Sequence, residues 1–375
     1  VTKTYVFRPG SYAIDVELHI DNQTKLPWQG RFYRQLQRER SDSNGVVYTY
    51  TGGVIYSDTE KYEKIDFDDM DDANLNRTIA GGWMAMIQHY FLSAWIPDAK
   101  QPNQYYSVAL GNNRYVLGMV TDAQSIAAGA VGNFQTQLFI GPKLQDMLEK
   151  LAPGLELTVD YGWLTIISKP LFWLLSWSES VAGNWGWAIA IVTLIIKLFF
   201  FPLSAASYRS MANMRKLQPK IAALRERYGD DRQRMSQGMM EIYKKEKINP
   251  FGGCLPIVVQ IPVFIALYWV LLESVELRQA PFIFWIQDLS IKDPYYVLPL
   301  LMGASMLIQT KLNPPPPDPV QAKVMMALPV IFTAFFAFFP SGLVLYWVVN
   351  NVLSILQQWH ITRASERADM VAKAG

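Results

Sequence analysis

Cysteine and histidine are almost absent from this sequence, whose 375 residues include Cys254 and three histidines, His19, His89 and His360. A single thiol builds neither a disulfide nor a thiolate metal site, so cysteine gives no information about the redox compartment. The histidines fall in three separate regions, which argues against a histidine-based triad or zinc site. A glycine-rich phosphate-binding loop is also missing. We therefore predict that the chain is not an enzyme.

Charged residues are scarce as well. They make up 18% of the chain, below the roughly 25% typical of soluble proteins, while 51% of the residues are hydrophobic. Before residue 161 the sequence is mixed, as in a soluble domain, and after it apolar blocks alternate with short polar ones. The composition therefore indicates a membrane protein with a soluble N-terminal domain.

The charges that are present are unevenly distributed. Residues 1–160 hold 14 basic and 19 acidic residues, whereas residues 204–249 hold 11 basic and 5 acidic ones. Because basic loops stay on the cytoplasmic side of a membrane, we expect 204–249 in the cytoplasm and 1–160 on the opposite side. The chain opens at Val1 inside a strand-like pattern, so we expect further sequence to precede it.

Residues 1–160 carry several short segments in which apolar and polar residues alternate, the period of a half-buried strand. These segments are 12–20, 105–110, 115–121 and 135–140. Two other segments, 82–95 and 142–151, have the composition of helices. We therefore predict a β-sandwich-like domain with a few helices.

The segment 61–72 is strongly acidic, and we interpret it as a solvated loop. A metal site is the alternative interpretation, but a regular ligand-spacing loop is missing. Its carboxylates would come from Asp66, Asp68, Asp69, Asp71 and Asp72.

The remainder is predicted to be α-helical. Residues 161–183 are rich in Trp, Leu and Phe, and Lys169-Pro170 interrupts them, which favours an amphipathic helix in the membrane interface with Trp163, Trp173 and Trp177 at headgroup depth. Residues 184–361 then form a five-helix membrane core, and 362–375 form a cytoplasmic tail. The five predicted spans cover about 185–202, 251–275, 295–312, 324–339 and 343–361.

Residues 204–249 show helical spacing interrupted at 229–231, which predicts a cytoplasmic helical hairpin. One interpretation of its basic residues is a solvated face near anionic lipid. The other is contact with ribosomal RNA or with incoming polypeptide, for which flexible methionines are suited. The candidate contact residues are Met211, Met214, Arg215, Arg225, Arg227, Met235 and Met239.

Lys197 lies inside the first predicted span, where a charge costs roughly 2.5–3.5 kcal/mol on insertion scales. Thr193 is four residues away on the same helix face. One interpretation is snorkelling of the lysine to the cytoplasmic surface, about 9 Å away. The other is a polar cavity open to the cytoplasm, which would explain Lys197, Thr193 and Gln260 together. Asn350 and Asn351 are the other conspicuous polar residues within the spans.

Several of these features together resemble the YidC membrane protein insertase family. They include the span with an internal cation, the basic methionine-rich hairpin and three specific stretches. These stretches are Asn-Pro-Phe-Gly-Gly-Cys-Leu-Pro at 249–256, Leu-Arg-Gln-Ala-Pro-Phe at 277–282 and Phe-Pro-Ser-Gly-Leu-Val-Leu-Tyr-Trp at 339–347. The resemblance covers the whole chain and is to the Gram-negative form, which has a large periplasmic domain and an additional N-terminal span.

The resemblance implies a bacterial inner-membrane protein with residues 1–160 in the periplasm, and it implies that no nucleotide, metal or other cofactor is needed. It implies a hydrophilic groove, open to cytoplasm and lipid, that accepts hydrophobic segments of nascent membrane proteins and releases them into the bilayer, alone or with the Sec translocon and its accessory subunits, and with the ribosome as a further partner. The family cation is usually arginine, and here Lys197 takes its place, so the charge is kept while the planar fork is lost. The groove residues expected from the sequence and the resemblance are Lys197, Thr193, Gln260, Tyr346, Trp347 and Asn350.

Two other functions remain as alternatives. The first is a membrane-embedded folding chaperone or assembly scaffold that moves no segment across the membrane. The second, a small-molecule transporter, is disfavoured because neither an internal repeat nor paired broken helices are visible.

Overall fold

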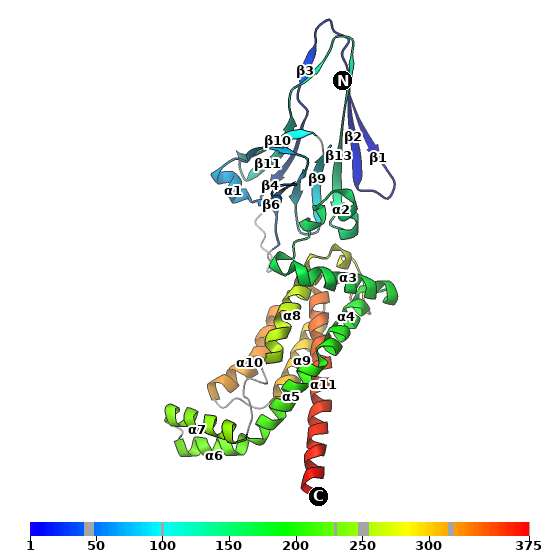
Figure 1. Ribbon diagram of the computed structural model, residues 1–375. Coiled ribbons are helices and arrows are strands. Elements are labelled where there is room, and N and C mark those ends of the chain that lie inside the picture. Colours follow the sequence, from blue (N-terminus) through cyan, green and yellow to red (C-terminus); the bar gives the residue numbers. More distant parts are fainter. Residues whose placement is uncertain (41–48, 99–100, 229–230, 247–254, 314–318, 375) are drawn as a thin grey trace. The chain divides into compact units, whose positions relative to one another are not determined.

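The computed structural model describes residues 1–40, 49–98, 101–228, 231–246, 255–313 and 319–374. The chain forms two compact units (Figure 1). The first comprises Val1–Asp160 together with Glu273–Val275, and the second comprises Tyr161–Leu272 and Glu276–Gly375.

The first unit is a sandwich of two antiparallel sheets, accompanied by a small two-stranded sheet. The larger sheet has the order β1-β2-β13-β9-β8-β5-β6, and the smaller one β4-β11-β10-β7. The strands of the larger sheet are β1 (Thr2–Phe7), β2 (Ala13–Asp21), β5 (Gly52–Ser57), β6 (Lys61–Ile65), β8 (Trp83–Ile87), β9 (Phe91–Pro97) and β13 (Val131–Pro142). Those of the other two sheets are β4 (Tyr33–Glu39), β7 (Asn76–Ala80), β10 (Pro102–Gly111) and β11 (Arg114–Thr121), and β3 (Trp28–Gly30) with β12 (Gln124–Ile126).

Two apolar clusters cover opposite faces of the larger sheet. The cluster between the two main sheets includes Val16, Tyr105 and Leu117, all buried. The cluster on the other face includes Leu148 of α2 (Gln145–Leu151) and Leu155 of η1 (Leu155–Thr158). The middle of the larger sheet is therefore buried on both sides.

This double burial explains one wrong prediction. Residues 82–95, predicted as a helix, form most of the two strands β8 and β9. Along β8, Met84 and Met86 face the cluster between the sheets, while Trp83 and Ala85 face the other cluster. A strand buried on both faces carries no polar alternation, so its continuous apolar run looked like a helix.

The other predictions for the first unit agree more closely with the structure. The four predicted strands are confirmed, because they coincide with β2, β10, β11 and β13. The helix predicted at 142–151 is present as α2, but it begins three residues later than predicted because β13 runs through Pro142. The acidic segment 61–72 is not a loop, because it forms β6 and α1 (Phe67–Asp72). Asp66 and Asp69 form a capping box at the N-terminus of α1.

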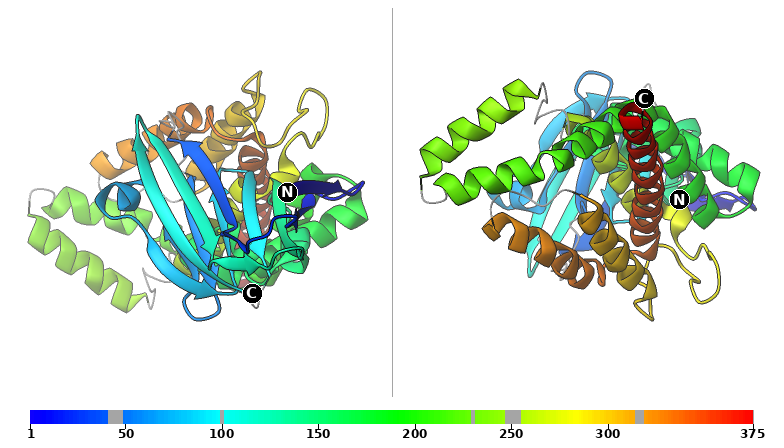
Figure 2. Two further views of the ribbon diagram at one scale, coloured as in Figure 1. Left: turned by 90° about the horizontal axis from the view of Figure 1, so that it is seen from above. Right: turned by 90° about the horizontal axis from the view of Figure 1, so that it is seen from below.

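The second unit is helical. Two short helices accompany the longer ones: η2 (Gly162–Leu164) precedes them in the chain, and η4 (Val275–Leu277) follows the eighth α-helix and begins at the last residue of the first unit. The longer helices are α3 (Thr165–Ala182), α4 (Trp185–Phe199), α5 (Phe201–Lys216), α6 (Gln218–Tyr228), α7 (Arg232–Lys245), α8 (Leu255–Glu273), α9 (Val297–Leu312), α10 (Pro319–Phe336) and α11 (Ser341–Ala374). Figure 2 shows α6 and α7 side by side as a hairpin.

Within the described ranges, no helix taken alone has the length and hydropathy expected of a membrane span. The pair α4 and α5 does so together, with a bend of 68° between the two helices. Three shorter apolar helices are Val258–Glu273, Val297–Leu312 and Val320–Phe336.

Local sequence signals set the two ends of α4. Gly183 ends α3 in the left-handed conformation, and Asn184 caps α4 by accepting hydrogen bonds from the backbone N–H groups of Gly186 and Trp187. At the other end α4 stops at Phe199, and Pro202 lies in the first turn of α5, where its missing N–H is tolerated. The predicted span 185–202 therefore corresponds to α4 and the first residues of α5.

The connection between α8 and α9 closes one end of the helical unit. Buried Asp293 accepts hydrogen bonds from the backbone N–H of Leu298 at 2.7 Å and from the indole of Trp285 at 2.9 Å. The first N–H groups of α11, those of Ser341 and Gly342, donate to carbonyl groups of the same connection. The starts of α9 and α11 are thus fixed to one loop.

Candidate functional site

The candidate site is a cavity of about 310 Å³ within the helical unit, here called the lysine cavity. Its lining combines one ammonium group with hydroxyl and amide side chains, although it lies among apolar helices. The lining residues are Lys197 of α4, Ser204, Ser207, Tyr208 and Met211 of α5, Gln260 of α8, Met306, Gln309 and Thr310 of α9, Asn313, and Trp347, Asn350, Asn351 and Ser354 of α11.

Lys197 is half-buried, and its Nζ donates a hydrogen bond of 2.7 Å to Oγ of Ser354. That hydroxyl in turn donates to the carbonyl oxygen of Asn350 at 2.7 Å. No carboxylate among the described residues forms an ion pair with Lys197. Its positive charge is therefore held by neutral dipoles, and a carboxylate that enters the cavity would not have to displace an acidic partner.

Two further amide side chains are fixed to hydroxyl groups on neighbouring helices. Gln260 Nε2 of α8 donates to Ser204 Oγ of α5 at 3.0 Å. Asn351 Nδ2 of α11 donates to Ser305 Oγ of α9 at 3.0 Å. Each bond joins two helices, so the polar residues hold the walls of the cavity as well as line them.

A second, more apolar hollow of about 210 Å³ adjoins the lysine cavity, and the two share Lys197, Gln260, Trp347 and Asn350. Its aromatic wall comes from Phe264, whose ring centroid lies 4.6 Å from that of Trp347 and 5.5 Å from that of Tyr346. The indole N–H of Trp347 is buried and has no hydrogen-bond partner among the described residues. The site therefore passes from polar to aromatic across Trp347.

The structure brings together five of the six residues expected in the groove. Lys197, Gln260, Trp347 and Asn350 line both hollows, and Tyr346 lines only the apolar one. Thr193 lines neither, contrary to the expectation from its spacing. It is 1% exposed and its hydroxyl donates to the carbonyl oxygen of Ile189 at 2.6 Å, so its polar group is turned back onto its own helix.

The predicted hairpin residues divide between two places. Met211 and Met214 lie on α5, and Met211 lines the lysine cavity. Arg215, also on α5, donates to the carbonyl oxygen of Leu312 at 2.6 Å. The predicted hairpin 204–249 therefore begins too early, because its first part is the bent continuation of α4.

The hairpin itself consists of α6 and α7. Arg227 lies on α6 with its guanidinium carbon 5.4 Å from the ring centroid of Tyr228, and it lines a hollow of about 550 Å³ with Arg234 and Lys245 of α7. Met235 and Met239 are half-buried on α7. A hydrogen bond from Lys220 of α6 lowers the pKa of Glu246, which follows α7. The side chain of Arg225 lies outside the described residues, as do 229–230 and 247–254.

Sequence reasoning missed the hydroxyl residues Ser204, Ser207 and Ser354. A signal for Ser354 was present, because it follows Trp347 by seven residues and Asn350 by four, which places all three on one face of α11. Ser204 and Ser207 lie just after Pro202, in a segment assigned to the hairpin.

Comparison with known proteins covers nearly the whole chain. Residues 177–368 match the family model described as 60Kd inner membrane protein, and residues 1–174 match the one described as YidC periplasmic domain. The chain belongs to the YidC family. It is an inner-membrane protein with a periplasmic domain, which confirms the predicted family, fold class and location.

Curated members of the family are similar to almost the whole of this chain. The membrane protein insertase YidC of Nitrosococcus oceani is 60% identical over 368 residues, which are 98% of this chain and 68% of the relative. That of Methylococcus capsulatus is 59% identical over 371 residues, again 98% and 68% of the two chains. A crystal structure of an active YidC insertase with its first transmembrane domain resolved is 20% identical, with a TM-score of 0.47, and covers 86% of this chain and 78% of that one. The chain is thus a member of a family of membrane protein insertases.

Proposed function

We propose that the lysine cavity receives the polar, often acidic tail of a hydrophobic nascent segment, and that the segment then leaves sideways into the bilayer. The observation that carries this proposal is the charge of Lys197, which has a hydroxyl partner but no acidic one within the described residues. A carboxylate about 4 Å from a cation gains about 4 kcal/mol at an effective dielectric constant of about 20. That attraction offsets part of the free energy needed to bring the tail into the membrane.

The aromatic side of the site supports the second half of the mechanism. Tyr346, Trp347 and Phe264 form a continuous apolar wall next to the polar cavity. An apolar segment that moves along this wall into lipid gains about 25 cal/mol for each Å² of apolar surface that it buries. We therefore propose that insertion is driven by the burial of apolar surface, with no covalent step and no cofactor.

We propose five spans for the helical unit, built from α4 with the start of α5, α8, α9, α10 and α11. The fixed loop at the start of α9 and α11 supports a closed periplasmic end, and we place the lysine cavity on the cytoplasmic side. The proposed spans 185–202, 251–275, 295–312, 324–339 and 343–361 end with the basic tail in the cytoplasm.

The test of the cavity is insertion of a single-span substrate with an acidic tail by the purified protein in liposomes. We expect Lys197→Arg to insert like the wild type because it keeps the charge. Lys197→Met should lose at least about tenfold in rate, equal to about 1.4 kcal/mol, and Lys197→Glu should lose more. Lys323→Glu, a reversal at an exposed lysine of α10 that does not line the cavity, is the matched control and should change little.

A second substrate with a neutral tail sharpens this test, because all the variants should insert it at similar rates. Equal insertion of the acidic-tailed substrate by the wild type and the Arg, Met and Glu variants would remove Lys197 from the mechanism. A wild-type protein that helps the substrate fold but leaves its tail outside the liposome would instead support the chaperone alternative.

We propose that the hairpin of α6 and α7 makes the first contact with the nascent segment, and that the ribosome and the Sec translocon are further partners. The hollow of the hairpin is lined by three basic residues, Arg227, Arg234 and Lys245, and by one acidic residue, Glu241, and this excess of positive charge supports a role in binding an acidic surface. Replacing residues 218–246 by a flexible linker keeps α5 and the cavity, and should abolish insertion while the helical unit still folds. Replacing the three basic residues by Gln is the milder companion variant, and unchanged insertion by the linker variant would contradict the capture role.

A further inference from the structure

Two hydrogen-bond donors lie at the boundary between the polar and the aromatic side of the candidate site. Trp347 and Asn350 are three residues apart on one face of α11, and both line the lysine cavity and the adjoining apolar hollow. The indole N–H of Trp347 is buried without a partner among the described residues. Asn350 accepts a hydrogen bond from Ser354 through its backbone carbonyl, while no described residue bonds its side-chain amide.

Hydroxyl groups of the helical unit satisfy themselves in a way that the indole cannot. Thr193 donates to the carbonyl oxygen of Ile189 and Ser305 to that of Met302, both at 2.6 Å. A hydroxyl lies close to the backbone and reaches a carbonyl one turn back on its own helix. The N–H of Trp347 lies at the edge of a large ring, beyond the reach of its own backbone. Its acceptor must therefore come from another helix or from another molecule.

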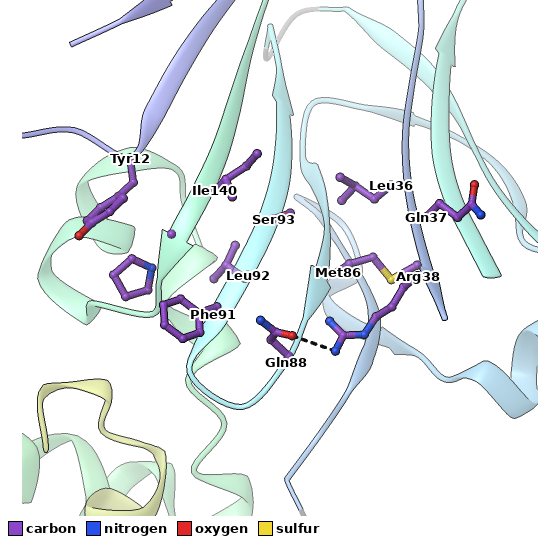
Figure 3. A pocket seen from close by; sticks show the side chains of 12 residues that line it. Tyr12, Leu36, Gln37, Arg38, Met86, Gln88, Phe91, Leu92, Ser93 and Ile140 are labelled. Carbon is purple, nitrogen blue, oxygen red and sulfur yellow. Dashed lines mark hydrogen bonds between the residues drawn. The ribbon is translucent and has the colours of Figure 1, made fainter. Parts of the chain in front are cut away.

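The neighbours of the indole offer it no good acceptor. Its ring centroid lies 4.6 Å from that of Phe264 on α8 and 5.5 Å from that of Phe336 on α10, so aromatic carbon surrounds it. A buried donor left without an acceptor bears the full desolvation cost of its polar group. The hollow of about 440 Å³ in the first unit differs, because there Arg38 donates to Oε1 of Gln88 at 2.9 Å (Figure 3).

One kind of apolar segment carries the matching acceptor. In a regular helix each carbonyl oxygen is bonded by the N–H four residues later, so the middle of the helix offers no open acceptor. A proline has no N–H and leaves the carbonyl four residues before it open. Lipid cannot bond that carbonyl, so it remains costly in the bilayer. An apolar segment with a proline therefore brings the acceptor that the boundary lacks.

We propose that Trp347 and Asn350 determine specificity by binding the open backbone carbonyl of a nascent segment whose helix is interrupted by proline. This inference rests on the proposed function, because the segment has to pass along the aromatic wall. As the segment replaces the contact between Phe264 and Trp347, the indole N–H turns to the open carbonyl. The amide of Asn350 donates to the same oxygen, which has two lone pairs and accepts both bonds.

The experiment uses the full chain in liposomes and three labelled single-span segments with the same acidic tail. They differ at one central position, which holds leucine, proline or leucic acid. Leucic acid replaces the N–H by an ester oxygen, so it opens the same carbonyl as proline without the proline ring. Binding is followed by fluorescence anisotropy as the ratio of protein to lipid rises. The wild type should bind the proline and ester segments about three- to tenfold more tightly than the leucine segment, the range of one hydrogen bond within a membrane.

Variants are compared by the ratio of these affinities, because a change in the wall affects all three segments. Trp347→Phe keeps an aromatic ring but removes the N–H, so the ratio should fall close to 1. Asn350→Leu removes the second donor, and the ratio should fall partway. Trp359→Phe is the matched control and should keep the ratio, since Trp359 is 53% exposed on the same helix and lines neither hollow.

Nuclear magnetic resonance of the protein labelled with ¹⁵N-tryptophan gives a direct signature. The indole signal of Trp347 is assigned by its loss in Trp347→Phe. Its proton should shift downfield when the proline or ester segment binds, and not when the leucine segment binds. A purely structural role of the indole would produce no such difference between segments.

Three results would overturn the inference. They are equal binding of the three segments to the wild type, as expected if water serves the indole N–H, a ratio that survives Trp347→Phe, and tighter binding of the proline segment alone, which would indicate recognition of a bent shape. Lys197→Met separates this inference from the proposed function, because it should weaken all three segments and preserve their ratio. Unchanged binding of all three to Lys197→Met would contradict the proposed role of the lysine, while the ratio would still decide the role of the two donors.

Discussion

Each unit holds a cation that is buried or half-buried and has no acidic partner among the described residues, but the two surroundings differ. In the first unit Arg34 is 2% exposed, donates to Oδ1 of Asn103 at 3.0 Å and stacks 4.4 Å from the ring centroid of Phe32. In the second unit Lys197 is half-buried and faces a cavity of about 310 Å³. Packing encloses the arginine, whereas the lysine faces a space large enough for water and for a substrate group.

This comparison contrasts an enclosed cation with one that faces a cavity. Burial lowers the pKa of Arg34 to about 10, because the charged form loses its hydration. A group enclosed in this way acts only on folding. A cation beside a cavity is open to another molecule, and we propose that the charge of Lys197 acts on a substrate in this way. We therefore expect changes in the sandwich core to alter stability and changes around the cavity to alter insertion.

The largest expected effect is on the sandwich core. Trp83 is 1% exposed, stacks on Tyr56 and donates to the carbonyl oxygen of Pro153 at 2.9 Å. Trp83→Ala should lower the free energy of unfolding of the first unit by about 3–5 kcal/mol. Pulse proteolysis in urea measures this loss, and Phe7→Ala, at a side chain that is 71% exposed, should lose less than about 0.5 kcal/mol.

The same core variant also tests the separation of roles. At a temperature where Trp83→Ala is folded, its insertion of a single-span substrate should match that of the wild type. A parallel loss of stability and insertion would show that the two units do not act separately, and the comparison between the two cations would no longer hold.

An exchange of cation type should affect the two sites differently. Lys197→Arg is expected to keep insertion, but Arg34→Lys should destabilise the first unit by about 1–3 kcal/mol at pH 7. The ammonium does not reproduce the planar fork, so Oδ1 of the buried Asn103 is left without its donor. Thermal unfolding and insertion are both measured for Arg34→Lys and for Lys197→Arg, and the two sets of results test this contrast.

The pH dependence of Arg34→Lys carries a definite sign. A buried base whose folded pKa is lower than its unfolded pKa binds fewer protons in the folded state, so stability rises with pH between those two values. In the wild type this window opens near pH 10, the lowered pKa of Arg34. A buried lysine in place of Arg34 moves the window below pH 10.4, because the ordinary pKa of lysine is about 10.4. The loss of stability in Arg34→Lys should therefore shrink between pH 7 and pH 10. A deficit that stays constant over this range would mean that the lysine remains fully hydrated.

The smallest expected effect lies beside the cavity. Ser354→Ala removes the acceptor for Lys197 Nζ, but water in the cavity can take its place, so insertion of an acidic-tailed substrate should fall by only about two- to fivefold, roughly 0.4–1 kcal/mol. Ser180→Ala, at an exposed hydroxyl that bonds the carbonyl of Trp177, should have no effect on the same assay. A loss as large as that of Lys197→Glu would show that the hydroxyl, and not the charge, binds the tail.

Several strands of the sandwich were predictable because one face of each is wetter than the other. Strands β2, β10 and β13 retain enough polar alternation to be identified directly. The central strand β8 was not predictable, because both of its faces are dry and its apolar run has no period. Alternation reports the contrast between the two faces of a strand, so it disappears where that contrast is absent.

The candidate site was predictable where a polar residue stood out against apolar surroundings. Lys197, Gln260 and Asn350 are conspicuous for that reason. The position of Thr193 was misjudged, because a threonine can satisfy its hydroxyl on its own helix and needs no cavity. Ser204 and Ser207 were missed because the 68° bend that brings them to the cavity depends on how α5 packs, which spacing along the chain does not record.

The length of α11 has a mechanical consequence. Its 34 residues extend for about 51 Å, well beyond the roughly 30 Å thickness of a hydrocarbon core, and they include the cavity residues Trp347, Asn350 and Ser354. An unbroken helix is stiff over such a length, so it behaves as a lever whose two arms move together. A force on the last turns of α11 would tilt or rotate the part of the helix that lines the lysine cavity. The force that reaches Lys197 through Ser354 would depend on what binds the C-terminal end of α11.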